Sequence, residues 1–192
     1  MTIGDVYQFV FRGLLAEEAL DREGRESSRS QRIEYARIRN LLGIDVMDDG
    51  HVNSADKMSQ VYVAIAAFEN SVRELVSDVM RENFGEDWWE LKVKPEIRND
   101  AKQRMENEEK VRWHVQRGNE PLNYTMIGQL LTIILNNFDV FEAFMHDRDW
   151  TKNIFDTIEK SRNVIMHSGS LSDRDMARIG SFIKDWNAQV AL

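Results

Sequence analysis

The residues of this sequence best suited to chemistry lie close together near its C-terminal end, in the segment Arg162-Asn163-Val164-Ile165-Met166-His167. On a helix Asn163 and His167 are one turn apart and share a face, with Arg162 on its flank. An arginine guanidinium is a permanent planar cation that binds two phosphate oxygens at once, and histidine exchanges protons near neutral pH. Together these groups suit attack of a ribose 2'-hydroxyl on the neighbouring phosphate.

The spacing from Arg162 to His167 is informative only together with the residues around it. With four histidines in 192 residues, an arginine followed by a histidine four to six positions later should arise about once by chance. Requiring Asn163 directly after Arg162 lowers that expectation to roughly 0.07. Glu159, one turn before Arg162, is a further candidate because its carboxylate could hold the guanidinium in place. A weak surface pair is the other interpretation of Glu159.

The segment is predicted to lie at the end of one helix of a helical hairpin. Asp149 can cap a helix that carries apolar residues at helical spacing, and Gly169 is placed to end it. Ser172 and Asp175 then resemble a capping box that opens a last helix. His167 would sit near the C-terminal end of the first of these helices, where the helix macrodipole favours imidazolium.

The rest of the chain also follows a 3.6-residue period, and no strand alternation is present, so we predict an all-α helical bundle. The clearest buried stripe spans about residues 56–80, and a wider one runs over 124–145 with a break near Asn136-Asn137. Two N-terminal helices, 6–20 and 31–42, joined by a polar stretch rich in serine, form an extension over residues 1–50, ahead of a helical domain over 51–192, and we expect the two parts to form one compact unit. The remaining predicted features are a turn at 48–50, a charged surface helix over 96–117, and packing roles for Trp113 and His114.

Composition narrows the function classes. No cysteine occurs, which removes disulfides, thiolate metal sites and thiol nucleophiles and suits a reducing cytoplasm. The four histidines form no cluster at metal-ligand spacing, and no phosphate-binding glycine loop or nucleophile elbow is present, so we expect neither a metal nor a cofactor. The sequence has no signal peptide and no apolar run of roughly 20 residues, so we expect no membrane association.

The net charge of −8 weighs mildly against a nucleic-acid partner, which usually leaves a basic footprint. The acidity is uneven, however. Residues 151–192 contain six basic and five acidic side chains, so the C-terminal end is nearly neutral and compatible with transient RNA contact.

At the motif the sequence resembles the HEPN superfamily, whose catalytic members carry an arginine, a polar residue and a histidine at the spacing of Arg162, Asn163 and His167. The likeness covers about residues 56–190 and is closest to the branch found in an RNA-surveillance endonuclease and in bacterial defence proteins; the first 50 residues match no family that we can name. Besides the motif it includes Trp88-Trp89, Arg104-Met105, Trp113-His114, the segment 121–124 and the segment 138–144.

The resemblance implies a metal-independent endoribonuclease with an RNA substrate, in a toxin or defence setting, with a regulatory partner that the sequence does not identify. It also implies a homodimer, which the chemistry favours because one motif supplies only one histidine for acid and base roles. In HEPN toxins silenced by adenylylation, a tyrosine follows the histidine by two positions. Gly169 stands there in this chain, so that route is not implied.

Two other functions fit parts of the sequence. A catalytically idle HEPN bundle could bind a nucleotide or a protein, and an unrelated helical adaptor could use the long apolar stripes as its interface. The motif favours the endoribonuclease, whereas the acidic net charge favours the other two.

Overall fold

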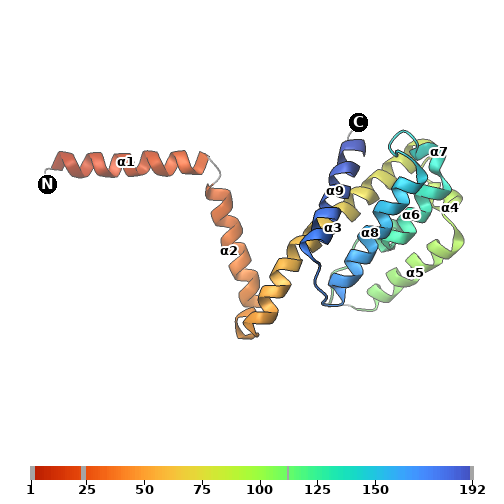
Figure 1. The fold of residues 1–192 in the computed structure, drawn as a ribbon, viewed down its shortest axis with the longest axis horizontal. Coiled ribbons are helices and arrows are strands. Elements are labelled where there is room, and N and C mark those ends of the chain that lie inside the picture. Colours follow the sequence, from red (N-terminus) through yellow and green to blue (C-terminus); the bar gives the residue numbers. More distant parts are fainter. Residues whose placement is uncertain (1–2, 23–24, 112, 191–192) are drawn as a thin grey trace. The chain divides into compact units, whose positions relative to one another are not determined.

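The computed structural model describes residues 3–22, 25–111 and 113–190, and within the first two helices the side chains of 3–9, 17, 21 and 25–31 fall outside that description. All regular elements in these ranges are helices, which confirms the predicted all-α class (Figure 1). The chain divides into two compact units, Met1–Asn53 and Ser54–Leu192.

The main structural element of the second unit is the long helix α3 (Asp49–Phe84). The predicted apolar stripe is its buried face, from Met58 through Ile65 and Val72 to Val79. The helix is longer than the 56–80 range predicted from the sequence. It begins directly after Asp48, whose carboxylate accepts a hydrogen bond from the backbone N–H of His51 at 3.1 Å. Asp49 and Gly50 therefore belong to the helix, and the predicted turn there is wrong, because a capping aspartate precedes them.

The second apolar series is broken where predicted. Helix α6 (Ile127–Asn136) ends and α7 (Phe138–Phe141) begins around Asn137. The Asn137 side chain donates to the carbonyl oxygen of Ile133 at 2.9 Å. The start of the series lies in a separate short 3₁₀ helix, η2 (Pro121–Tyr124).

The C-terminal hairpin consists of α8 (Arg148–Met166) and α9 (Asp173–Val190). The cap of α8 is Asp147, which accepts from the backbone N–H of Trp150 at 2.7 Å; Asp149, predicted as the cap, lies inside the first turn. The capping box before α9 is confirmed. The Asp175 N–H donates to the Ser172 hydroxyl and the Ser172 N–H to the Asp175 carboxylate, each at 3.2 Å.

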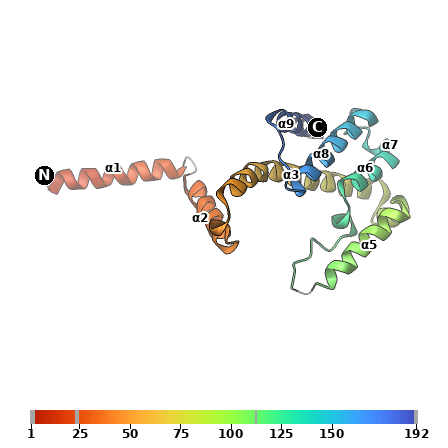
Figure 2. The same cartoon turned by 60° about the horizontal axis from the view of Figure 1, so that its bottom comes forward.

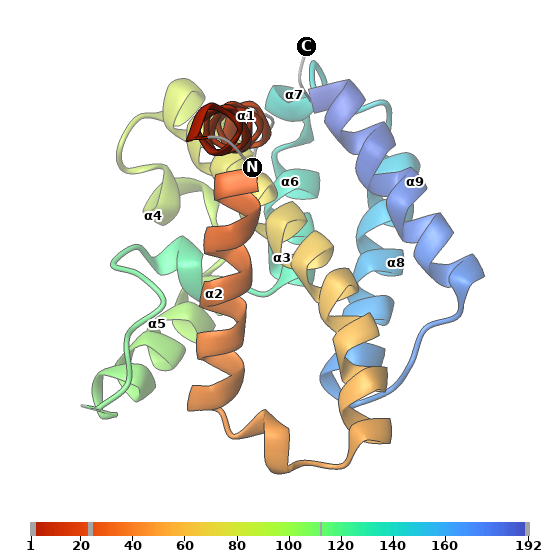
Figure 3. The same ribbon diagram turned by 90° about the vertical axis from the view of Figure 1, so that its left-hand side faces the viewer.

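Figure 3 shows the helices α3, α8 and α9. They pack around one aromatic cluster. The Trp186 indole of α9 is 1% exposed. It stacks on Trp150 at a centroid distance of 6.2 Å and meets the rings of Phe68 and Phe155 edge-on at 5.3 and 5.6 Å. Aromatic burial of this kind fixes the faces that the three helices turn to one another.

Two helices cover the other part of this unit: α4 (Trp88–Lys92), which the sequence analysis did not predict, and α5 (Pro95–Glu109). The charged segment 96–117 was predicted as one helix, but α5 ends at Glu109 and the chain returns to η2 through a loop (Figure 2). Trp113 in this loop is 86% exposed, so the predicted packing role of Trp113 is wrong. Beyond Met105 the stripe had only widely spaced valines, too few to bury a further helical turn.

The first unit holds α1 (Ile3–Arg22), α2 (Arg25–Leu41) and the 3₁₀ helix η1 (Ile44–Val46). The two predicted helices are present, but α2 begins six residues before the predicted start at Gln31. The serines predicted to form a linker, Ser27, Ser28 and Ser30, are therefore helical.

Candidate functional site

Arg162 lies on α8 and reaches across to α3. Its Nε atom is 3.0 Å from Oε1 of Glu69, and the Arg162 side chain is 37% exposed whereas that of Glu69 is 12% exposed. The two atoms form an ion pair without the alignment of a hydrogen bond. The two terminal nitrogens of Arg162 have no ion-pair or hydrogen-bond partner among the residues that the structure describes.

The Glu69 carboxylate is shared with a second guanidinium. Arg73, one turn along α3, places Nη2 3.3 Å from Oε2 of Glu69 and is only 18% exposed. Arg73 also donates to the Asn70 side chain at 3.1 Å and to the carbonyl oxygen of Thr125 at 3.3 Å. Two cations around one carboxylate leave the cluster with one net positive charge. An anion is therefore the ligand that this cluster favours.

Glu159 is oriented differently from the sequence-based expectation. A methyl group added at Gly128 would lie 3.2 Å from Oε1 of Glu159, so the carboxylate packs against the first turn of α6. A negative charge is stabilised there by the helix macrodipole. The ion-pair partner of Arg162 among the described residues is Glu69 rather than Glu159.

Asn163 and His167 are both exposed at the end of α8. The backbone N–H of His167 donates to the carbonyl oxygen of Asn163 at 3.2 Å, which places the two residues one helical turn apart as predicted. His167 is the C-cap residue, with φ −100° and ψ 25°. Its imidazole therefore projects from the last helical position into solvent, beyond the half-buried Arg162.

The chain after His167 closes the helix with two hydrogen bonds. The N–H of Ser168 donates to the carbonyl oxygen of Ile165 at 3.0 Å, and that of Gly169 to the carbonyl oxygen of Val164 at 2.8 Å. This is the Schellman arrangement, in which one residue adopts the left-handed conformation. That residue is Ser168, with φ 60°, and not Gly169. Gly169 is required instead for space, since a methyl group there would lie 2.8 Å from the Val164 carbonyl oxygen.

Sequence reasoning missed Glu69 and Arg73 because both lie far from the motif along the chain. A weak signal was present. Glu69 follows Phe68 and precedes Val72 at the edge of the buried stripe, with an arginine four residues later. A charged pair so close to the buried face of a helix must be partly buried, so its charges need oppositely charged partners. Solvated pairs lie on the opposite face.

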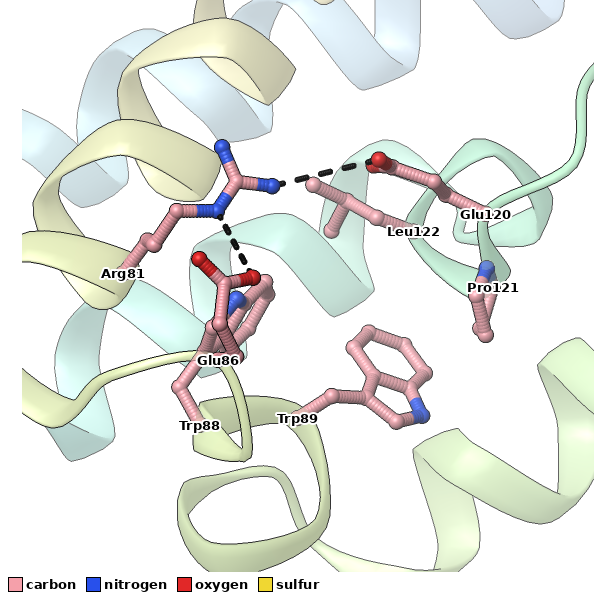
Figure 4. A pocket seen from close by; sticks show the side chains of 7 residues that line it. All are labelled: Arg81, Glu86, Trp88, Trp89, Glu120, Pro121 and Leu122. Carbon is pink, nitrogen blue, oxygen red and sulfur yellow. Dashed lines mark ion pairs between the residues drawn. The ribbon is translucent and has the colours of Figure 1, made fainter.

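Neither of the two hollows described in this unit is lined by a residue of the motif. One of about 170 Å³ is lined by Trp88, Trp89 and Pro121 and bordered by Arg81 (Figure 4). The Arg81 guanidinium there is compensated by Glu86 at 3.4 Å and Glu120 at 3.9 Å. No described group of three acidic or histidine side chains is close enough to hold a metal ion. Likewise, none of the described helices has the length and apolar character needed to cross a membrane.

Residues 64–191 match the family described as Swt1-like HEPN. This range contains every residue of the cluster, from Glu69 on α3 to His167 at the end of α8. Comparisons with curated proteins and with solved structures gave no match.

The geometry at the end of α8 predicts opposite effects for two neighbouring substitutions. Ser168→Gly removes the strain of a left-handed serine, roughly 1–2 kcal/mol, but increases the entropy of the unfolded chain, so the free energy of unfolding should rise by about 0.5–1 kcal/mol. Gly169→Ala forces a methyl group onto the Val164 backbone and should lower the free energy of unfolding by about 1–3 kcal/mol. Urea denaturation measures both changes. A neutral Gly169→Ala variant would contradict this description of the helix end.

Proposed function

We propose that this chain, which belongs to the Swt1-like HEPN family, is a metal-independent endoribonuclease. The observation that carries the proposal is how the guanidinium of Arg162 is held. Its Nε faces Glu69 while its two terminal nitrogens are left for a ligand, on the same helix end as the exposed His167. A planar cation held in this way is suited to bidentate contact with a phosphate.

The proposed reaction is a transesterification within the RNA. The ribose 2'-oxygen attacks the adjacent phosphorus, the bond from phosphorus to the 5'-oxygen breaks, and the products carry a 2',3'-cyclic phosphate and a 5'-hydroxyl. Arg162 stabilises the charge that develops on the non-bridging oxygens, and His167 moves a proton from the 2'-hydroxyl or to the leaving oxygen. Asn163, one turn from His167, is placed to hydrogen-bond the same phosphodiester.

A complete acid and base set needs a second histidine, which a homodimer would supply. The surface around the motif supports this arrangement. Tyr62 on α3 and Met166 on α8 are exposed apolar residues, and they lie two turns from Glu69 and one turn from Arg162 on the same side of each helix. We propose that a second copy covers them and brings two motifs to one cleft.

The biological setting follows from the family and from composition. We propose a cytoplasmic toxin or defence effector, because the chain has no cysteine and the motif resembles that of HEPN nucleases in such systems. A net charge of −8 should keep non-specific RNA binding weak, since affinity for a polyanion rises with clustered cations. Control by a regulatory partner is consistent with such an effector.

The first expected outcome concerns the motif. Arg162→Ala should slow RNA cleavage on the order of 10² to 10³ fold, and His167→Ala on the order of 10² to 10⁴ fold, with the fold intact by circular dichroism. His146→Ala is the control and should change little, and His114→Ala should leave kcat unchanged. Gel assays should show cleavage that persists in EDTA and fails on RNA methylated at the 2'-hydroxyl of the cut site.

Unchanged cleavage by both motif variants would reject the proposed site. A wild-type protein that cuts no RNA but binds a nucleotide or a protein would instead support the idle-module alternative.

The second expected outcome concerns Glu69 as the positioning residue for Arg162. Glu69→Gln should lower kcat about tenfold or more with little change in KM, because the guanidinium is no longer held for the transition state. Combined with Arg162→Ala, it should add almost nothing, since residues that act through one another are not additive. A purely structural role would give additive losses. Glu159→Gln is the matched control, and coupling of Arg162 to Glu159 instead would favour the assignment made from the sequence.

The third expected outcome concerns the dimer. Sedimentation at micromolar concentration should give a dimer, and specific activity should fall on dilution. Tyr62→Glu places a charge in the proposed interface and should shift the protein to monomer and reduce activity, whereas Leu91→Glu, at an exposed apolar position on α4, should do neither. A monomer at all concentrations with undiminished activity would remove the basis of the two-histidine mechanism.

A further inference from the structure

The loop between α5 and η2 carries two of the most exposed apolar side chains in the described part of the second unit. Trp113 is 86% exposed and Val115 is 87% exposed. The His114 ring meets the indole of Trp113 edge-on, with centroids 5.5 Å apart and planes at 75°. Such a contact can occupy at most one face of the indole, so at 86% exposure at least one face is open to solvent, although a tryptophan normally gains stability from burial.

Hydrogen bonds and a cation–ring contact hold the base of this loop. Arg117 Nε donates to Glu108 on α5 at 2.5 Å, and its guanidinium lies over the buried Tyr124 ring at 5.3 Å. The Tyr124 hydroxyl donates to the Gly118 carbonyl oxygen at 3.0 Å. Burial raises the pKa of Glu108, but the hydrogen bonds and charge of Arg117 outweigh it and hold that pKa below its usual value. The anchor is thus ionised at neutral pH and is lost only as the pH falls through this lowered value.

The loop base is also connected to the candidate site. Arg104 on α5 donates to the Tyr124 carbonyl oxygen at 2.8 Å, and Arg73 on α3 donates to the next carbonyl, that of Thr125, at 3.3 Å. Arg73 shares Glu69 with Arg162. The ends of α5 and α8 accordingly lie at the same end of this unit, at the bottom of Figures 1 and 3.

We propose that this loop is a second contact site for single-stranded RNA, in which one unpaired nucleobase stacks on the indole of Trp113. The proposal rests on the proposed function and specifies its substrate as unpaired RNA. Base stacking on an exposed aromatic ring is the general way in which proteins hold single strands, and bases in a duplex present no free face for it.

Size and charge favour a nucleobase over a protein partner at this loop. A tryptophan buries about 150–250 Å², so Trp113 and Val115 together fall well below the roughly 800 Å² per partner of a stable protein interface. A single stacked base needs only one ring. In addition, residues 110–117 contain Lys110 and Arg112 besides Arg117, whose charge is balanced by Glu108, and these two further cations suit a phosphate backbone.

The test measures binding separately from cleavage. In the His167→Ala background, the affinity for a labelled unstructured RNA is compared for Trp113→Ala, Trp113→Phe and Leu91→Ala. Leu91 is the matched control because it is 71% exposed and apolar but lies on α4. Trp113→Ala should weaken Kd roughly 5- to 100-fold, Trp113→Phe should retain most of the affinity, and Leu91→Ala should have no effect. Binding of a fully paired RNA should not respond to Trp113→Ala.

Equal RNA affinity of the parent and Trp113→Ala, or no RNA binding at all, would overturn the inference. So would a Trp113→Ala variant that changes sedimentation but not RNA affinity, which would make the loop a protein contact. With His167 restored, Trp113→Ala should raise KM and leave kcat unchanged. Cleavage with unaltered KM would remove the inference and leave the proposed nuclease intact. If the wild-type protein cuts no RNA but binds it in a way that depends on Trp113, the inference about the loop would stand and the proposed nuclease activity would be rejected.

Discussion

The site depends on one carboxylate, that of Glu69, placed between Arg73 on its own helix and Arg162 on α8. At 12% exposure a lone glutamate would be costly, and so would two neighbouring guanidinium groups without an anion between them. Each group therefore requires the others. The pair adds a polar contact between α8 and α3 beside the aromatic cluster that packs them, and it holds one side of Arg162 while leaving the other side available. Structural and chemical roles are combined in the same three side chains.

Arg162 and His167 lie in different environments at the end of α8. Arg162 lies within the packed part of the helix, where partial burial strengthens its interaction with an anion. His167 lies at the C-cap, in water, where proton exchange with solvent is unhindered. The left-handed Ser168 and the close approach of Gly169 to Val164 turn the chain away directly afterwards, so α9 does not cover the histidine. The glycine that stands in place of the tyrosine of adenylylated toxins thus has a steric reason to be there.

An acidic protein acting on RNA needs local rather than global attraction. The cluster around Glu69 has one net positive charge, and the loop that carries Trp113 has basic residues without acidic ones. The helix that precedes this loop, α5, and the helix that carries Arg162, α8, both end at the bottom of Figures 1 and 3. Under the proposed function, such an arrangement would give weak binding to RNA in general and would restrict productive contact to strands that reach both places, since phosphate attraction alone carries no sequence or shape information.

The sequence by itself determined the all-α class, the buried stripe of α3, the break at Asn137, the capping box before α9 and the spacing of Arg162, Asn163 and His167. These features depend on contacts between residues that are close in the sequence, so helical periodicity and capping residues predict them. It did not determine that Asp147 rather than Asp149 caps α8, or that α5 ends at Glu109, because several residues could satisfy each local rule. Only the tertiary structure decided that Glu69 holds Arg162, that Glu159 packs against α6, and that Trp113 is exposed. Each of these depends on which residues of distant helices meet, and a partner more than ninety positions away leaves no periodic trace in the chain.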